Sequence, residues 1–170
     1  MNAFAHLMAG WIVLFGLAFF SPFFGPHLGL LAMAFAMLPD IDIFFSKTIK
    51  DHHLTYTHSP FLWTILSIIG FLAADIIGFS KGYVVLLLAE PLFHLFCDFT
   101  TARTAGIPIF FPFSKKEYSL YPLKKYFGDM APFSLGKRHL EFLKNYMNNK
   151  SLLVYEAAIM ITGVAIFFFW

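Results

Sequence analysis

The sequence is short of charged residues and nearly free of cysteine, and both shortages exclude familiar protein classes. Charged residues make up 13% of the 170 positions, against roughly 25% in soluble globular proteins. Hydrophobic residues reach 59%, so polar side chains are too few to cover a surface that faces water. The single cysteine, Cys97, cannot form an intramolecular disulfide, which excludes a disulfide scaffold and a cysteine-rich zinc site. The composition therefore indicates a polytopic membrane protein.

Nucleic-acid binding and a cleaved leader are also unexpected. The formal net charge is only +2, which is too small to indicate direct nucleic-acid contact. No Lys or Arg precedes the first apolar run, although a cleavable signal peptide normally has a basic start. We therefore expect the first apolar segment to be retained.

Five apolar stretches predict an all-α fold with about five transmembrane helices, in a single membrane-embedded domain over residues 1–170. A helix needs about 20 residues to cross a hydrocarbon core of ~30 Å. The second stretch is interrupted at Pro39, so a helix from His27 to Pro39 would span only about 20 Å. The acidic residues after Pro39 should then lie at or below the headgroup level. The stretches cover Leu7–Phe24, Leu28–Phe45, Pro60–Phe79, Tyr83–Phe99 and Leu152–Trp170.

Residues 100–150 have a different composition and predict an interfacial loop. This region contains four prolines, many aromatic residues and most of the basic residues. Aromatic rings at the headgroup level and long basic side chains that reach toward water fit such a location. We expect one short amphipathic helix in it, around Arg138–Met147.

The distribution of basic residues predicts the orientation in the cytoplasmic (inner) membrane. Eleven of the twelve Lys and Arg residues lie in the connections after the second and fourth apolar stretches, and Lys81 alone lies on the other side. By the positive-inside rule, both basic connections and the N-terminus are cytoplasmic. Trp170 is then expected outside.

Seven ionisable residues are expected at the cytoplasmic ends of these helices, where they could form a metal site. His94 and Asp98 are four residues apart and so share a helix face, with Glu90 one turn further in. Ionisable residues in a membrane segment by default mark a site, and imidazole with carboxylate suits zinc, manganese or iron(II). The set exceeds the needs of one tetrahedral ion, so one or two ions are expected. It comprises His6, Asp40, Asp42, His53, His58, His94 and Asp98.

Simpler interpretations exist for several of these residues. His94 and Asp98 could be an intrahelical hydrogen-bonded pair, and Asp40 could be a turn residue after Pro39. His6 alone could lie at the interface without a partner, and His52 could be merely a neighbour of His53. Convergence of the whole set on one face argues for a site, because buried charges without partners are costly.

Four motifs resemble those of a known family. They are Leu38-Pro39-Asp40-Ile41-Asp42, His53-Leu54-Thr55-Tyr56-Thr57-His58-Ser59, His94-Leu95-Phe96-Cys97-Asp98-Phe99-Thr100-Thr101, and Gly106-Ile107-Pro108 with Phe111-Pro112-Phe113-Ser114. In this order they resemble the LexA-binding, inner-membrane-associated hydrolases, also described as membrane-bound metal-dependent hydrolases. The first and third motifs are more remotely similar to zinc-dependent phospholipase C and P1-type nucleases.

The resemblance implies a set of metal ligands, and the chemistry of nearby residues suggests supporting and substrate-binding roles. It implies His6, Asp40, His53, His58, His94 and Asp98 as metal ligands, with Asp42 close behind. We expect Asp42, Glu90 and His53 to be catalytic candidates, with Glu90 orienting His94, and Thr57, Ser59 and Thr101 to support the ligands. The family often has a basic residue where Leu54 stands here. If that basic residue contacts a substrate phosphate, Arg103 or Lys115, together with Lys116, would have to take its place, or the substrate differs.

The resulting hypothesis is a membrane-embedded, metal-dependent hydrolase, with zinc the first choice of cofactor. Its expected substrate is a phosphoester in an amphiphilic or lipid-like molecule, and membrane lipid is its expected surrounding. One alternative is a non-catalytic membrane protein whose loop docks a cytoplasmic regulator. Another is a divalent-cation transporter, which would need more acidic or His residues in the far half of the helices than Asp75 and His27.

Overall fold

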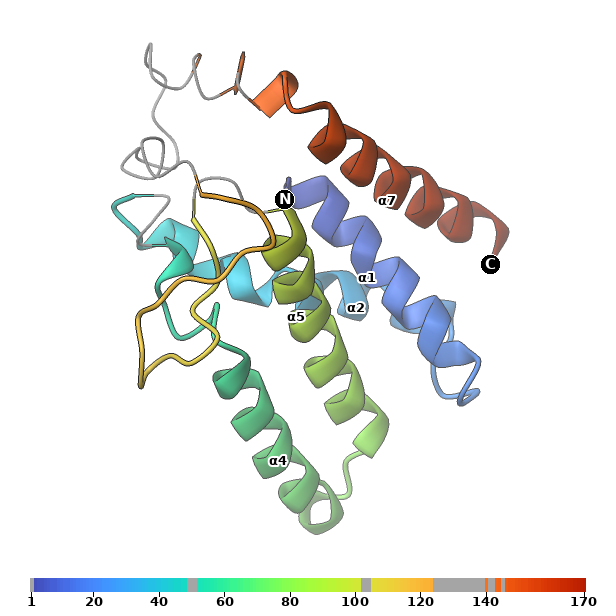
Figure 1. The fold of residues 1–170 in the computed structure, drawn as a ribbon. Helices are drawn as coiled ribbons and strands as arrows, with labels where there is room; N and C mark the ends of the chain where they lie inside the picture. The colour runs from blue at the N-terminus through green and yellow to red at the C-terminus, as the bar shows by residue number, and fades with distance from the viewer. Residues whose placement is uncertain (1, 49–51, 102–104, 124–139, 141–142, 145) are drawn as a thin grey trace.

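The computed structural model describes residues 2–48, 52–101, 105–123, 140, 143–144 and 146–170, and arranges them as a bundle of helices (Figure 1). Within these residues the regular elements are all helical, and an isolated bridge between Ile107 and Tyr118 is the sole extended pairing. The expected all-α class is therefore confirmed for the described part of the chain.

Helices α1 (Ala3–Ala18) and α7 (Lys150–Phe169) run side by side, although they come from opposite ends of the chain (Figure 1). Asn2 caps α1, because its Oδ1 accepts the Ala5 backbone N–H at 2.9 Å. Gly163 permits the close approach: a Cβ there would lie 2.6 Å from the Met8 Cβ. Further along the two helices, the indole of Trp11 packs edge-on against the rings of Phe167 and Trp170.

The second apolar stretch forms a bent pair of helices. Helix η1 (Pro26–Leu28) leads into α2 (Gly29–Ala36), and the 3-10 helix η2 (Leu38–Phe44) follows at an angle of 44°. Pro39, at the start of η2, cannot donate the backbone hydrogen bond that would continue α2. The bend places Asp40 beside the end of α5, where it faces His94, and Asp42 beside the histidines that precede α4.

Helices α4 (Pro60–Ile77) and α5 (Lys81–Thr101) form an antiparallel hairpin (Figure 1). Gly78 closes α4 in the left-handed conformation, with φ of +68°, which a side chain would disfavour. At the hairpin tip Lys81 donates to Asp75 at 2.8 Å.

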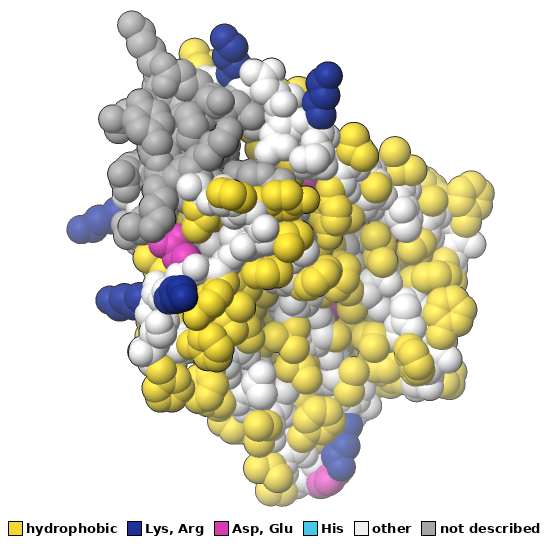
Figure 2. Space-filling view, in the orientation of Figure 1, with side chains coloured by type: hydrophobic (Ala, Val, Ile, Leu, Met, Phe, Trp, Pro, Cys, Tyr) yellow, Lys and Arg dark blue, Asp and Glu magenta, His cyan; other side chains and the backbone are white. Residues whose placement is uncertain are grey.

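The described residues contain three helices that are long and apolar enough to cross a membrane: α4, α5 and α7. The bent pair of η1–α2 and η2 raises the number to four if it forms one span. Helix α1 has 16 residues, or about 24 Å of rise, which is short of a ~30 Å core. Five crossings therefore stay a prediction. Figure 2 shows hydrophobic side chains over most of one face, with basic ones mainly at the loop end.

The described part of the expected interfacial loop, residues 105–123, packs across the ends of α4 and α5. Ile107 and Tyr118 bond through their backbones at 2.9 Å in both directions, and Ile107 packs against the Trp63 and Leu95 core. Ser59 ties the segment to α4 by donating to the Phe111 carbonyl at 2.7 Å. Half of the residues of the helix expected around Arg138–Met147 lie outside the described residues, and those described there are helical.

Candidate metal centre

The ends of four helical segments bring histidine and aspartate side chains together at one end of the bundle. His6 comes from the first turns of α1, Asp40 and Asp42 from η2, His58 from the residue before the α4 cap, and His94 with Asp98 from the last turns of α5. His6, His58, His94 and Asp98 are each no more than 2% exposed. The convergence expected from the sequence is thus present in the structure.

Four residues form the most compact group: Asp40, His58, His94 and Asp98, with ligand atoms all within 4.8 Å of one another. His94 Nε2 lies 3.1 Å from Asp98 Oδ2 and 3.4 Å from Asp40 Oδ1. His58 Nε2 lies 3.6 Å from Asp40 Oδ1 and 3.8 Å from Asp98 Oδ2. Donors about 2.0–2.1 Å from a tetrahedral ion lie about 3.4 Å apart, so these spacings suit one shared cation.

The hydrogen bonding of His94 supports the same interpretation. Its Nδ1–H donates to the Ala36 carbonyl at 2.6 Å, which directs Nε2 at the two carboxylates. In the described part of the chain, neither Nε2 of His94 nor either ring nitrogen of His58 makes a hydrogen bond. A cation placed between these buried ring nitrogens and the carboxylate oxygens would satisfy both. The residues present therefore fit a divalent metal.

His6 lies beside this group and not within it. Its Nε2–H donates to Asp98 Oδ1 at 3.2 Å, while Asp98 Oδ2 faces His94 and His58. The His6 ring also stacks on that of His94, with centroids 3.7 Å apart and planes 12° apart. These contacts suit a side chain that orients Asp98 and His94, whereas the sequence predicted a ligand.

A second group consists of His52, His53 and His58. The ring of His58 lies 4.4 Å from that of His52 and 4.7 Å from that of His53, so His58 connects the two groups. The second group lies in the loop between η2 and α4 and includes His53, whose role as a ligand stays a prediction. It gives a place for a second ion.

His52 is the residue that sequence reasoning missed. The sequence suggests only that it is a neighbour of His53. In the structure, its Nε2 lies 3.2 Å from Asp40 Oδ1, and its Nδ1–H donates to Asp42. Burial lowers the pKa of His52, but the adjacent Asp40 and Asp42 carboxylates outweigh burial and raise the pKa to about 9. Without metal, an imidazolium therefore bridges the two acids. The Asp-x-Asp spacing could have suggested a shared cationic partner.

Asp42 organises the loop that carries the histidines. Its Oδ2 accepts the Thr57 hydroxyl at 2.8 Å and also the Thr55 hydroxyl, and Oδ1 accepts from His52. Thr57 therefore contacts an acid beside the centre, and its supporting role stays a prediction. By contrast, the hydroxyl of Ser59 donates to a loop carbonyl, and that of Thr101 donates to the Cys97 carbonyl within α5.

The expected role of Glu90 as the residue that orients His94 is wrong. The Nδ1–H of His94 is already taken by the Ala36 carbonyl, so Glu90 cannot receive it. Glu90 is 1% exposed, and neither of its oxygens has a hydrogen-bond partner within the described ranges. Glu90 and His94 do share a face of α5. However, α2 lies close enough to α5 for the Ala36 carbonyl to accept the Nδ1–H of His94.

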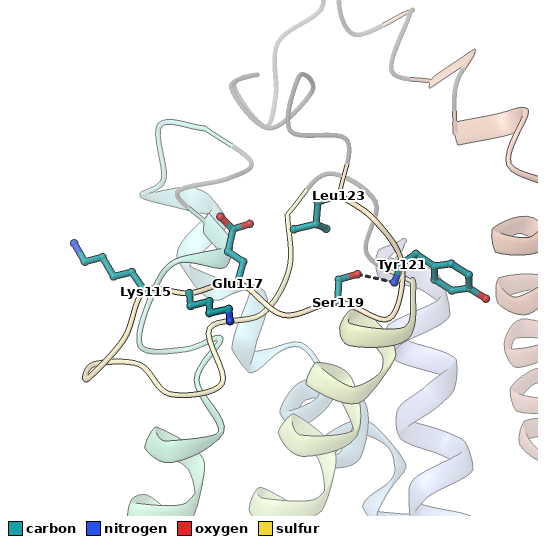
Figure 3. Close-up of a pocket in the computed structure, with 6 residues that line it drawn as sticks. Lys115, Glu117, Ser119, Tyr121 and Leu123 are labelled. Atoms are coloured by element: carbon teal, nitrogen blue, oxygen red, sulfur yellow. Dashed lines mark hydrogen bonds between the residues drawn. The ribbon is translucent and has the colours of Figure 1, made fainter.

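The basic residues expected to bind substrate lie elsewhere or outside the described residues. Lys115 and Lys116 line an open hollow of about 510 Å³ together with Glu117, Ser119, Tyr121 and Leu123 (Figure 3). No residue of the two histidine–aspartate groups lines that hollow. Arg103 belongs to the part of the chain that the structure does not describe.

The comparisons with known proteins give one match. The family model for the YdjM inner membrane protein matches residues 1–170, which is the entire sequence. No curated protein and no solved structure matches the chain significantly.

Proposed function

The chain belongs to the YdjM inner membrane protein family, the LexA-binding, inner-membrane-associated family that its motifs resemble, and from this premise we propose that it is a membrane-embedded metal-dependent hydrolase. The observation that carries the proposal is the group of Asp40, His58, His94 and Asp98. Within it, buried ring nitrogens face carboxylate oxygens at ion-sharing distances without hydrogen bonds. This arrangement supports ligands grouped around a shared cation, because buried polar groups in a purely structural network are as a rule hydrogen-bonded.

We assign the first ion to these four residues and a second to His52, His53 and His58, with zinc as the first choice. A bound divalent ion would act as a Lewis acid toward water and the scissile group. His6 and the Ala36 carbonyl hold the inner ligands in place. Asp42, through Thr55 and Thr57, holds the histidine loop against the inner group.

The exposed parts of the centre support an amphiphilic substrate. Asp40 and Asp42 have side chains 19% and 12% exposed, so the centre is reached from the η2 side. The residues around these acids are apolar and exposed: Ile41, Phe44 and Phe45 are 51%, 73% and 85% accessible. A water-soluble substrate would gain nothing from such surroundings, whereas an amphiphile could keep its tail in lipid.

We propose a phosphoester as the bond cleaved. The polar head would reach the carboxylate–histidine centre, and Lys115 and Lys116 would supply positive potential at the same end of the bundle. In the orientation that the basic residues predict, this end is cytoplasmic.

The test compares hydrolysis of a lipid phosphoester with that of its water-soluble headgroup analogue by metal-loaded protein. We expect wild type to cleave the lipid substrate faster and His94→Ala to cleave neither. Asp75→Asn, a change in the exposed ion pair at the opposite end, is the control and should retain activity. Equal turnover of both substrates would refute entry from lipid, and activity that survives His94→Ala would refute the proposed centre.

A further inference from the structure

A second buried carboxylate lies outside the metal centre. Glu156 is 1% exposed and is the sole charged residue of the sequence between Leu152 and Trp170. A carboxylate within a membrane helix is costly, and such residues are retained where they have specific partners. The partners of Glu156 therefore indicate its purpose.

Those partners lie at the start of α1 and in the residues just before α7. The Asn2 backbone N–H donates to Glu156 Oε1 at 3.0 Å, and Asn2 Nδ2 donates to Oε2 at 2.7 Å. The Tyr146 hydroxyl also donates to Oε2. The carboxylate thus meets three donors at the positive end of the α1 dipole, which compensates for its burial.

Asn2 transmits this contact into α1. While its two donors face Glu156, its Oδ1 accepts the Ala5 N–H at 2.9 Å and its carbonyl accepts the His6 N–H at 3.2 Å. His6 is one turn further along, and its ring contacts both Asp98 and His94. Two residues therefore connect Glu156 on α7 to the inner group of the metal centre.

The other described contacts between α1 and α7 are apolar. Gly163 against Met8 and the ring contacts of Trp11 with Phe167 and Trp170 set how closely the helices approach. These apolar contacts carry no hydrogen bond between the two helices. The bidentate contact of Asn2 with Glu156 is directional and fixes the register.

We propose that Glu156 is a positioning residue of the metal centre: it holds the N-terminus of α1 in the register that keeps the His6 ring on Asp98 and His94. The inference rests on the proposed function, since it assigns Glu156 to the same centre. Helix α7 contributes no side chain to either histidine–aspartate group. Its effect on the centre is through Glu156, which positions α1.

The test is a double-mutant cycle on Zn²⁺ affinity, measured on the full-length protein in detergent by competition with a chelating dye. Loss of a residue that supports a ligand lowers metal affinity about 10–100-fold. Glu156→Gln should lower it about tenfold, because Glu156 contacts no ligand directly and acts through Asn2 and His6. In the His6→Ala background the same change should cost less than twofold. Asp75→Asn, also a carboxylate-to-amide change, should leave affinity unchanged.

Tyr146→Phe provides a milder variant in case Glu156→Gln fails to fold. It removes one donor and should weaken Zn²⁺ binding roughly threefold, as expected for one hydrogen bond, again only when His6 is present. An equal loss of affinity with and without His6, or no loss in either variant, would overturn the proposal.

A second experiment needs no metal and tests the positioning role of Glu156 separately from the proposed metal-dependent function. In protein labelled with ¹⁵N-histidine, Glu156→Gln or Tyr146→Phe should move the His6 ring resonance, and Asp75→Asn should not. Wild type that binds no Zn²⁺ would refute the proposed function while this experiment still decides the role of Glu156. A His6 resonance that stays in place in both variants would refute that role.

Discussion

Replacing Asp98 with asparagine should remove most of the metal affinity of the centre. Asp98 is 2% exposed and serves two histidines through separate oxygens: Oδ1 accepts from His6, and Oδ2 lies 3.1 Å from His94 Nε2. Asparagine keeps the shape but replaces the carboxylate with a neutral amide. The change therefore tests the charge of the ligand without leaving a cavity.

The expected loss follows from the number of donors. Structural zinc sites bind with about 10–16 kcal/mol at pH 7, so each of four donors contributes about 2.5–4 kcal/mol if shared evenly. Loss of one donor then weakens binding by roughly 10²–10³-fold. Elemental analysis of purified protein and Zn²⁺ competition titrations measure this loss, with Asp75→Asn as the matched carboxylate control.

Two results would refute the reasoning. Asp98→Asn protein that binds Zn²⁺ as tightly as wild type would show that the carboxylate is not a ligand. Wild-type protein that is purified without metal and takes up none on titration would show that the four residues form a packing network only.

Three further predictions follow from the structure. Glu90→Gln should retain wild-type metal content, because the His94 Nδ1–H donates to a backbone carbonyl and not to Glu90; metal loss in this variant would contradict the geometry. In metal-free protein, the pKa of His52 is raised to about 9, so its stabilisation is complete below about pH 6.5 and lost as pH rises through 9. The difference in melting temperature between wild type and His52→Gln should therefore shrink from pH 6.5 to pH 10; a constant difference would contradict this. A thiol-reactive reagent added outside intact cells should not label Ser119→Cys in a Cys97→Ala background, and efficient labelling would reverse the predicted orientation.

The membrane class and most residues of the centre could be predicted from the sequence, because they depend on local properties. Apolar runs of suitable length define where helices form whatever they pack against, so the ends of α4, α5 and α7 fall within a few residues of the predicted stretches. Polar side chains at the ends of such runs are excluded from the hydrocarbon core, so they gather with one another at the helix ends. That is why the convergence of His58, His94 and Asp98 could be expected before any contact was known.

The roles within the centre depend on contacts between distant segments, and only the tertiary structure decided them. Glu90 shares a face with His94, but the approach of α2 delivers the Ala36 carbonyl to the ring, and no local pattern encodes that approach. His52 joins Asp40 and Asp42 because the loop folds back on η2.

Glu156 is the clearest case of this division. In the sequence it is a lone acid in an apolar segment, without a motif or a neighbour of opposite charge. Its role depends on Asn2, which is 154 residues away in the sequence. The packing of α7 against α1 places the Asn2 backbone nitrogen 3.0 Å from Glu156 Oε1. Periodicity and composition report what each segment buries, whereas the choice of hydrogen-bond partner is made by how the segments are placed against one another in space.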